Sequence, residues 1–504
     1  MADAGGDGAP ALTAGQAAAA EVFAAWLVAS WDGTPFVLSG YAGTGKTHLC
    51  RHLLQLVENT GLCWTVVAPT HKAVGVLRQQ LAWAGLQPTW FPSTIHRLLR
   101  LKLRRQGDLE RCEETEQTAA SLENLGLVLV DEASMVDSTL LEIALRCAHP
   151  FRTRLVFVGD PAQLPPVGEP KSPVFAMARA AAARLTEVVR HQGPVLQLAT
   201  GLRNGQLPCQ RPPAFAPVRN DHGLVSALPR SAWLAAAQAG LRRAAELDNP
   251  DLARILCYTN RCLEELVPLA RRAIHGEMAD QLPVLPGEVL ITRSAVMAPA
   301  CRAGEEAAEE PDLLLGSNRE LLVRDVTPER CDLSEFGVGS DDGLLPPVIE
   351  TLTAEVETGD TRLSLRLLPP VGSAGRRQLD DVLQRLRQQA RDAGKQAGRG
   401  LWRRYFLVRD AFASLGPAAV LTVHRSQGST FGEVFIAGDV FWPQDPVLRQ
   451  QLVYVAVSRA SQAVWLTADG ERARHRPASS SHPALSFVYS THRLLKVRTP
   501  AVWQ

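Results

Sequence analysis

The first half of the chain repeats one pattern, in which a short apolar run ends abruptly in polar residues. The runs "PFVLSG", "CWTVVAPTHKA", "LGLVLVDEAS" and "RLVFVGDPAQLPP" turn polar at Gly40, Thr70, Asp131 and Asp160. Short continuous apolar runs are typical of strands buried on both faces, and helical segments lie between these runs. The pattern therefore predicts a parallel α/β sheet, whose ligands gather at the carboxyl ends of the strands. A helix is expected before it, from the N-cap Thr13 to about Ala29.

The same pattern returns in the second half, in "ARILCYTNR", "AVLTVHRSQG", "EVFIAGD" and "AVWLTADG". Between these runs, "GEVLITRSAV", "RELLVRDV" and "TRLSLRLLPP" resemble strands of a small β unit, followed by a basic helix over 376–404. Residues 302–345 are acid-rich and read as a loop. The predicted fold class is α/β, with two parallel-sheet domains in tandem and a small β-rich insertion in the second. The predicted boundaries are 1–195 for the first domain, 196–285 plus 409–504 for the second, and 286–408 for the insertion.

Composition narrows the class of protein only modestly. The 504 residues are 46% hydrophobic and 21% charged, as in an ordinary globular protein, and the net charge of +1 favours no particular partner. Nine scattered cysteines without a C-x-x-C pair suit reduced thiols, so a cytoplasmic location is expected, at the nucleoid when at work. We see no secretory signal and no run of about 20 apolar residues that would span a membrane.

The stretch "GYAGTGKT" matches the phosphate-binding pattern G-x-x-x-x-G-K-[ST]. Its backbone N–H groups can wrap phosphate oxygens, and the helix that follows points its positive end at them. Lys46 would reach the β- and γ-phosphates of ATP, and Thr47 would bind Mg²⁺. A plain glycine turn is the alternative, but a strand precedes the motif and a helix follows it. The predicted nucleotide-binding residues here are Gly40, Tyr41, Ala42, Gly43, Thr44, Gly45, Lys46, Thr47 and His48.

Paired acids follow the third apolar run. Asp131 would hold Mg²⁺, and Glu132 would polarise the attacking water. Without the phosphate loop, two solvated carboxylates in a turn would be the better interpretation. Gln163, after the next run, can hydrogen-bond both the γ-phosphate and the water. These residues together predict an NTPase, with ATP and Mg²⁺ as its cofactors, but they do not say what the energy is used for.

The order of motifs resembles the full series of superfamily 1 helicases, and within them the Dda-type and RecD-type branch, superfamily 1B. The series runs "LTAGQ", "GYAGTGKT", "APTHKAV", "STIHRLL", "VDEASMVD", "VGDPAQLPPVG", "LTEVVRH", "LTVHRSQGSTF" and "YVAVSRA". The resemblance implies two RecA-like domains with ATP between them. It implies that Gln16 contacts the adenine and that Arg190 and Arg459 act as arginine fingers on the γ-phosphate. It also implies that Gln427 and Gly428 face the ATP cleft.

The resemblance also implies a track for single-stranded DNA. Short hydroxyl, imidazole and ammonium groups suit phosphate oxygens and carry no base code. Thr94 is also a plausible N-cap, and His96 alone would more often be structural. The family places a strand-separating pin at about 97–123, where "LRLKLRRQGDLERC" reads equally well as a hairpin or a charged helix. The insertion at 286–408 resembles the family's SH3-like subdomain in position. The predicted DNA-binding residues are Thr70, His71, Lys72, Thr94, His96, Thr422, His424 and Ser426.

The expected function is that of an ATP-dependent 5′→3′ single-stranded DNA translocase and helicase in replication, recombination or repair, active as a monomer at duplex junctions. The polarity comes only from the resemblance. A RecD-like motor subunit of a larger repair complex is one alternative. An RNA-directed helicase or NTPase is the other, because residues that grip phosphates serve both nucleic acids.

Overall fold

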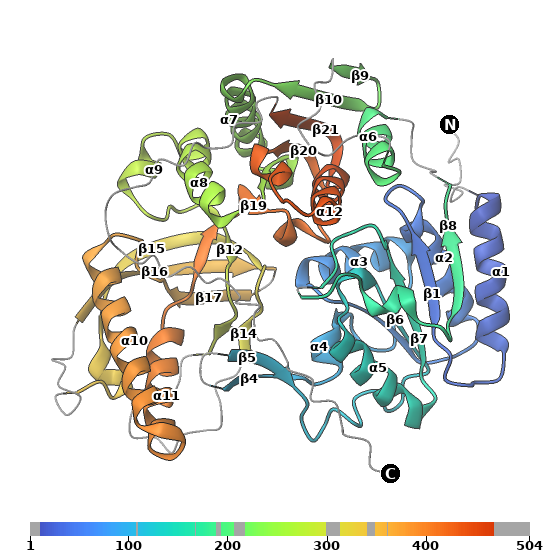
Figure 1. The fold of residues 1–504 in the computed structure, drawn as a ribbon, viewed down its shortest axis with the longest axis horizontal. Helices are drawn as coiled ribbons and strands as arrows, with labels where there is room; N and C mark the ends of the chain where they lie inside the picture. The colour runs from blue at the N-terminus through green and yellow to red at the C-terminus, as the bar shows by residue number, and fades with distance from the viewer. Residues whose placement is uncertain are drawn as a thin grey trace, which may run out of the picture.

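Three units build the molecule, and Figure 1 shows them side by side. The structure is a computed structural model, and it describes residues 11–106, 109–166, 168–187, 193–205, 217–298, 313–339, 348–359 and 361–467. The first domain lies on the right of Figure 1, the second at the top and the inserted unit on the left.

The first domain is a six-stranded sheet in the order β3-β2-β6-β7-β1-β8. All its strand pairs are parallel, as the apolar runs predict. The strands are β1 (Phe36–Gly40), β2 (Trp64–Ala68), β3 (Ser93–Thr94), β6 (Leu127–Val130), β7 (Arg154–Gly159) and β8 (Ala181–Leu185). Their carboxyl ends bring the four predicted polar clusters to one edge of the sheet.

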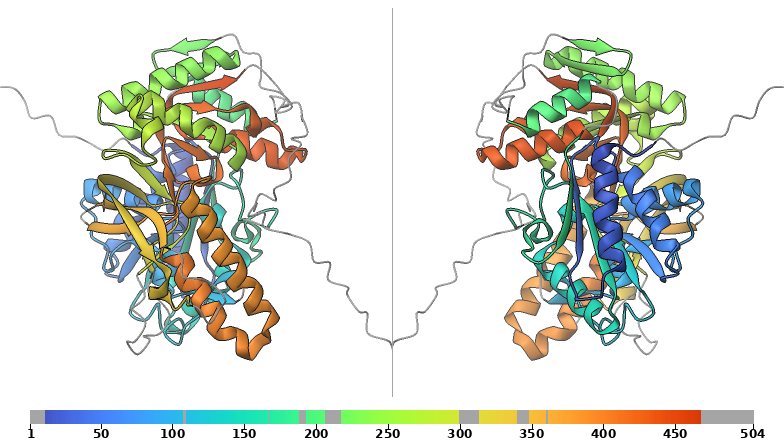
Figure 2. Two further views of the ribbon diagram at one scale, coloured as in Figure 1. Left: turned by 90° about the vertical axis from the view of Figure 1, so that its left-hand side faces the viewer. Right: turned by 90° about the vertical axis from the view of Figure 1, so that its right-hand side faces the viewer.

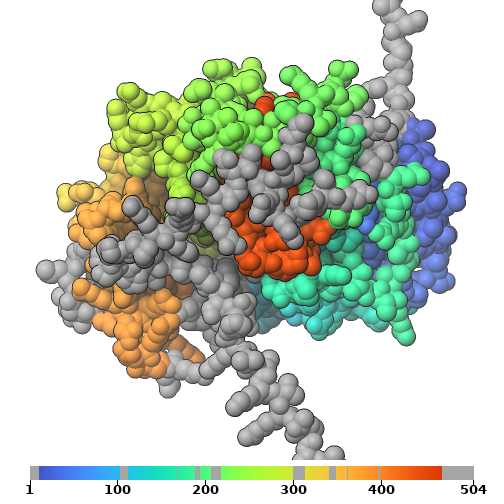
Figure 3. Space-filling view, turned by 45° about the horizontal axis from the view of Figure 1, so that its top comes forward, coloured from blue at the N-terminus to red at the C-terminus, as the bar shows by residue number. Residues whose placement is uncertain are grey.

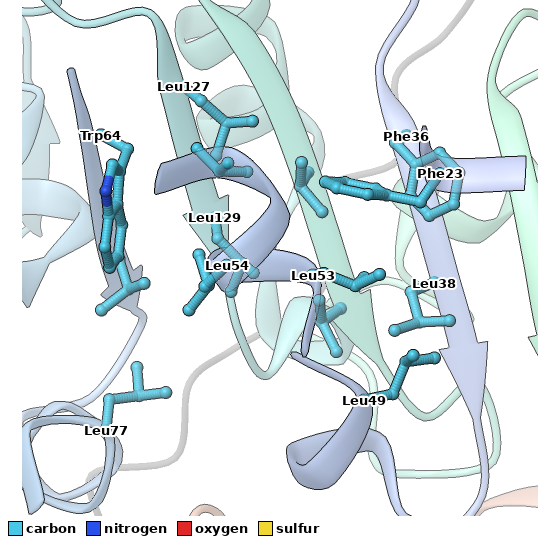
Figure 4. Close-up of a cluster of buried hydrophobic side chains, with 14 of the residues drawn as sticks. Phe23, Phe36, Leu38, Leu49, Leu53, Leu54, Trp64, Leu77, Leu127 and Leu129 are labelled. Atoms are coloured by element: carbon cyan, nitrogen blue, oxygen red, sulfur yellow. The ribbon is translucent and has the colours of Figure 1, made fainter. Parts of the chain in front are cut away.

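Helices cover both faces of this sheet. The first face packs against α1 (Ala14–Val28), α2 (Lys46–Glu58) and α3 (His71–Ala84), and the other against α4 (Ile95–Leu98) and α5 (Ser138–Phe151). Figure 4 shows the first of these cores, where leucines of α2 meet β1, β2 and β6. The helix α1 begins at the predicted N-cap with a capping box, in which Thr13 and Gln16 satisfy each other's backbone N–H.

The second domain is also a six-stranded sheet, in the order β19-β11-β20-β21-β10-β9. Only the β9–β10 pair is antiparallel. The strands are β9 (Val218–Asn220), β10 (Gly223–Leu228), β11 (Ala253–Cys257), β19 (Val420–Thr422), β20 (Phe431–Ile436) and β21 (Ala460–Thr467). One face packs on α6 (Pro194–Arg203) and α12 (Pro446–Ser458), the other on α7 (Arg230–Glu246) and α8 (Asn260–His275). Figure 3 shows the chain around α12 between the second domain's other elements and the first domain.

The inserted unit is an antiparallel sheet in the order β17-β16-β15-β12-β18. Its strands are β12 (Val289–Thr292), β15 (Glu320–Asp332), β16 (Val348–Thr358), β17 (Thr361–Arg366) and β18 (Leu415–Pro417), with the short pair β13 (Val296–Met297) and β14 (Leu313–Leu315) beside them. The sheet thus extends past the predicted end at 408, because β18 closes its edge beside β12. The strand "RELLVRDV" is confirmed by β15, but the loop predicted over 302–345 is wrong at β14 and where β15 continues to Asp332. Between the second domain and this sheet lies α9 (Met278–Gln281).

The predicted basic helix over 376–404 is two helices, α10 (Ala374–Asp392) and α11 (Gly394–Asp410). The chain reverses at Gly394, whose φ of 73° is open to glycine but strained for other residues. Figure 2 shows the pair as an arm at one end of the molecule. Apolar side chains of both helices pack with residues from β15 and the turn after it, so part of this basic segment is buried.

The chain after α4 forms a hairpin and not a charged helix. Strands β4 (Lys102–Gln106) and β5 (Leu109–Glu113) pair antiparallel. Figure 1 shows the hairpin projecting from the first domain toward the side of the inserted unit. Of the two interpretations of this segment, the hairpin is therefore confirmed and the charged helix is wrong.

Candidate functional site

The phosphate loop lies between β1 and α2, and its backbone curves tightly through left-handed glycines. Gly43 and Gly45 have φ values of 82° and 75°, and a Cβ atom on Gly40 would lie 2.8 Å from the Thr44 Oγ1 atom. The glycines are thus required by close approach and by the left-handed backbone. The loop delivers the N-terminus of α2, which runs over Lys46–Glu58, to the edge where the strands end.

The predicted catalytic side chains of this loop lie at the same edge. The Lys46 ammonium donates to the backbone carbonyls of Gly40, at 2.7 Å, and Tyr41, at 3.1 Å. Thr47 is exposed at the start of α2. Burial and the neighbouring Glu132 raise the pKa of Asp131 to about 7, although the charge of Lys46 opposes this. A cation bound here would stabilise the Asp131 carboxylate.

Glu132 has a strained backbone. Its φ of 52° is left-handed, at the step from β6 into the short 3₁₀ turn Ala133–Met135. Such a conformation costs a non-glycine residue about 1–3 kcal/mol and is found at functional sites. The Glu132 N–H donates to the Asp131 carboxylate at 2.9 Å, which fixes the two acids relative to each other.

Several predicted residues carry buried polar atoms without a hydrogen-bond partner among the described residues. These atoms are the Gln163 Oε1, the His48 Nε2 and the Arg459 Nε. Buried polar atoms are nearly always paired, so each of these three atoms has hydrogen-bonding capacity left for a polar ligand. Within the described residues, no group of three His, Cys, Asp or Glu side chains could hold a metal alone. Mg²⁺ fits this site as an ion held by Thr47 and Asp131 together with phosphate oxygens.

The Gln16 side chain already forms two hydrogen bonds in the structure. The buried side-chain amide donates to the Thr44 carbonyl at 3.2 Å, and its oxygen accepts from the Thr13 N–H at 3.1 Å. Gln16 therefore braces the phosphate loop from α1. One amide hydrogen is left for the predicted contact with adenine.

The two predicted arginine fingers have separate outcomes. Arg190 lies outside the described residues. Arg459 is buried, and its guanidinium donates to the Ser429 carbonyl at 3.1 Å and the Ser458 hydroxyl at 3.2 Å. Both partners belong to the second domain, so Arg459 is directed here to its own domain and keeps only its Nε unpaired.

The predicted DNA-binding residues form a second region, called here the strand side because a DNA strand is expected there. Its two threonines in the first domain are helix caps. Thr70 accepts from the Ala73 N–H and Thr94 from the Arg97 N–H, both at 3.3 Å. Burial, followed by nearby arginines, lowers the pKa of His71. Burial also lowers the pKa of His96 despite the opposing charge of Asp137. These imidazoles are therefore neutral near pH 7 and can serve as hydrogen-bonding groups.

Lys72 does not face an open surface, as a phosphate contact would require. Its ammonium lies 2.9 Å from the Glu320 carboxylate and 3.3 Å from that of Asp251. Arg254, from the second domain, pairs with the same two acids. Lys72 and Arg254 also lie over the Phe431 ring, at 5.1 and 5.2 Å. This "strand-side junction" of Lys72, Asp251, Arg254, Glu320 and Phe431 joins all three units.

The second domain's segment after β19 gives mixed outcomes. Thr422 is buried and accepts from the Arg425 N–H at 3.4 Å, whereas the half-buried His424 lies beside Tyr258. Ser426 is fully buried and donates to the Val423 carbonyl at 2.7 Å. The Ser426 hydroxyl is thus engaged inside the 3₁₀ turn His424–Ser426, and its contact with DNA stays a prediction.

The end of this segment contacts the first domain at two places. The Gln427 amide donates to the Leu164 carbonyl at 3.2 Å, directly after Gln163. A Cβ on Gly428 would lie 3.3 Å from the Thr70 Oγ1, so Gly428 packs on the start of α3 and not on the phosphate loop. The nucleotide contact of Gly428 stays a prediction, and its packing against Thr70 is a second contact with the first domain. A small pocket between the units is lined by Thr70, Lys72, Glu320, His424, Gln427 and Ser429, among others.

Sequence reasoning missed two residues of the second domain that touch the phosphate loop. Tyr454 hydrogen-bonds at Ala42, and the Arg203 guanidinium lies over the Tyr41 ring. Tyr454 opens the motif "YVAVSRA", but an apolar stretch of helix gave no signal that its hydroxyl crosses to another domain.

The chain matches known families and proteins along most of its length. Residues 11–227 match the family "AAA domain", and residues 417–467 match "UvrD-like helicase C-terminal domain". The ATP-dependent DNA helicase dda of Enterobacteria phage T4 is 24% identical over 85% of this chain and 93% of its own. The ATP-dependent RecD2 DNA helicase of Deinococcus radiodurans is 34% identical over 34% of this chain and 22% of its own. A crystal structure of Pif1 helicase from Bacteroides in complex with ADP-AlF3 and ssDNA aligns over 90% of this chain and 92% of its own, with 15% identity and a TM-score of 0.44.

Two parallel-sheet domains with a phosphate loop at their contact define a P-loop NTPase with tandem RecA-like domains. The ordered motifs and the matched families narrow the class from P-loop NTPases to helicases. Together they support a superfamily 1B P-loop helicase, an enzyme that couples ATP hydrolysis to nucleic-acid unwinding. No described helix is both long and apolar enough to cross a bilayer.

Proposed function

We propose that this protein is a 5′→3′ single-stranded DNA translocase and helicase that uses ATP with Mg²⁺. In this proposal it works as a monomer in the cytoplasm, at duplex junctions that arise in replication, recombination or repair. The main support is the segment 422–429, which touches the first domain beside Gln163 on the nucleotide side and at Thr70 on the strand side. One segment placed at both sides can link hydrolysis to stepping.

The residues have distinct parts in this proposal. Lys46 leaves the Gly40 and Tyr41 carbonyls to meet phosphate oxygens, and Gln163 orients the attacking water with its unpaired oxygen. Glu132 accepts the proton of that water. Mg²⁺, held by Thr47 and Asp131, supplies charge neutralisation to the phosphates when bound.

Strand contacts in the proposal fall to fewer residues than the sequence predicts. His71, His96 and His424 keep neutral imidazoles, and His424 lines the same pocket as Thr70. The hairpin β4–β5 is proposed as the pin, because it projects from the first domain directly after α4. The strand-side junction connects the three units beside the proposed track.

The first test is ATP turnover by the purified full chain, alone, with single-stranded DNA and with RNA. Stimulation by DNA supports the proposal. Equal or greater stimulation by RNA would replace it with an RNA-directed motor, and no stimulation by either would leave a subunit that needs a larger complex. Unwinding of duplexes with a 5′ or a 3′ tail tests polarity, and preference for the 3′ tail would overturn the proposed direction.

A further inference from the structure

The hydroxyl of Tyr454 joins the second domain to the phosphate loop. Tyr454 lies on α12 and is 1% exposed. Its hydroxyl donates to the Asp160 carboxylate at 2.6 Å and accepts from the Ala42 N–H at 3.0 Å. Burial and the nearby Asp160 charge raise the pKa of Tyr454 far above its usual range, so the hydroxyl keeps its proton.

Asp160 depends on this hydroxyl. Its carboxylate is fully buried and accepts from the Ala42 N–H at 3.1 Å, the Ala162 N–H at 2.9 Å and Tyr454. Among the described residues, no lysine or arginine forms an ion pair with it. A buried carboxylate without a cation is held by its hydrogen bonds, and charge-assisted bonds are the strong ones. One of these three bonds comes from the other domain.

The neighbouring loop residue is held by the second domain as well. The Arg203 guanidinium, at the end of α6, lies 3.9 Å from the centre of the Tyr41 ring. Arg184 of the first domain also lies against this ring and donates to its hydroxyl. Two consecutive residues of the phosphate loop, Tyr41 and Ala42, therefore contact the second domain directly.

The helix that carries Tyr454 leads to the strand side. Five residues later, Arg459 caps α12 and donates to the Ser429 carbonyl. Ser429 follows Gly428, which packs on Thr70. A continuous set of packed and hydrogen-bonded groups thus runs from Ala42 through α12 to the segment 422–429.

We propose that Tyr454 is a positioning residue that couples the nucleotide state of the phosphate loop to the second domain's hold on the strand. The inference rests on the proposed function, because it assumes a strand at Thr70 and His424. A bound nucleotide rearranges the loop around Ala42, and the Tyr454 hydroxyl passes this change to α12 and to Arg459. Without the hydroxyl, the loop still binds nucleotide, but the strand side no longer responds.

The test uses Tyr454→Phe in the full chain, which keeps the ring and removes only the hydroxyl. The dissociation constant of a fluorescent dT oligonucleotide is measured without nucleotide, with ADP and with a non-hydrolysable ATP analogue. In the unmodified protein the analogue should change this constant by about 5-fold or more, as allosteric couplings do. In Tyr454→Phe the ratio of the constants without nucleotide and with the analogue should fall to about one, while the constant without nucleotide stays little changed. The thermal midpoint should fall, because the buried Asp160 carboxylate loses one hydrogen bond.

Tyr405→Phe on α11 is the matched control, since it removes a tyrosine hydroxyl in the inserted unit. It should keep the ratio of the unmodified protein. Asp160→Asn is a second variant that weakens the same link and should also reduce the ratio. If Tyr454→Phe keeps the full ratio, the inference is wrong although the motor function stands. If the analogue does not change the dissociation constant of the unmodified protein, the proposed function is contradicted and the inference falls with it.

Discussion

The two contacts between the domains use opposite kinds of chemistry. On the nucleotide side, Ala42, Asp160 and Tyr454 form a buried set of short hydrogen bonds around one carboxylate. On the strand side, Lys72 and Arg254 share Asp251 and Glu320, and the Lys72 and Glu320 side chains are 21% and 25% exposed. A buried hydrogen-bond set has one geometry, whereas ion pairs near solvent tolerate exchange of partners and weaken with salt. The comparison indicates a nucleotide side built for defined geometry and a strand side built for adjustment.

The sharpest test of the nucleotide side is Glu132→Gln. Loss of the carboxylate should lower ATP turnover by about 10²–10⁴-fold, as for other general bases. Binding of a fluorescent ATP analogue should be retained, because the strained backbone and the side-chain shape remain. Phosphate release and equilibrium binding are the two measurements. Near-normal turnover would remove Glu132 from its assigned role.

Lys46→Ala tests the same side through a different step. Loss of one preorganised cation at the phosphates should reduce turnover by about 10²–10³-fold. Unlike Glu132→Gln, it should also weaken nucleotide binding. Lys171→Ala, at an exposed position, is the control for removing a lysine. Equal nucleotide affinity in Lys46→Ala and the unmodified protein would contradict a phosphate contact.

Glu320→Gln tests the strand-side junction. It leaves two cations, Lys72 and Arg254, with one shared acid, and should lower the free energy of unfolding by about 1–3 kcal/mol, between exposed and buried pairs. Urea denaturation measures it. Glu265→Gln, which breaks an exposed pair with Arg261 on α8, should cost at most about 0.5 kcal/mol. Equal effects of both variants would mean that the junction holds nothing together.

Removing Lys72 separates a structural role from a phosphate contact. If Lys72 belongs to the junction, Lys72→Met lowers stability while the salt dependence of DNA affinity keeps its slope. A phosphate contact would instead reduce that slope by about one. Titration of a dT oligonucleotide at several salt concentrations distinguishes the two.

The smallest expected effect concerns pH. Burial lowers the pKa of His424 from 6.5 in the folded chain, so the unfolded chain takes up a proton at higher pH. The stability due to the neutral imidazole is therefore complete above about pH 6.5 and is lost as the pH falls below it. His424→Gln should make the denaturation midpoint fall less between pH 7 and pH 5. A parallel fall in both proteins would exclude His424 as a source.

The strands were predictable because each is a short apolar run buried on both faces. In "VLVDEAS" and "VLSGYAG" the change from apolar to polar or glycine residues marks where the strand ends. The helix pair α10 and α11 was not, because both halves share one basic composition and a single glycine marks the reversal. Lys72 shows the limit for the site. Its neighbours Thr70 and His71 mark a strand end, but its partners Asp251 and Glu320 lie about 180 and 250 positions further along the chain.

The sequence by itself determined the two parallel sheets, the phosphate loop with its paired acids and the order of motifs, because local periodicity and short spacings encode them. Only the tertiary structure decided which polar groups are already engaged. Ser426 and Gly428 were assigned by motif, yet the first is buried in its own turn and the second packs on Thr70. Tyr454 gave no signal at all, since the Asp160 carboxylate that needs its hydroxyl comes from another domain. Long-range pairing of buried polar groups depends on how the domains meet, and that is a property of the assembled fold.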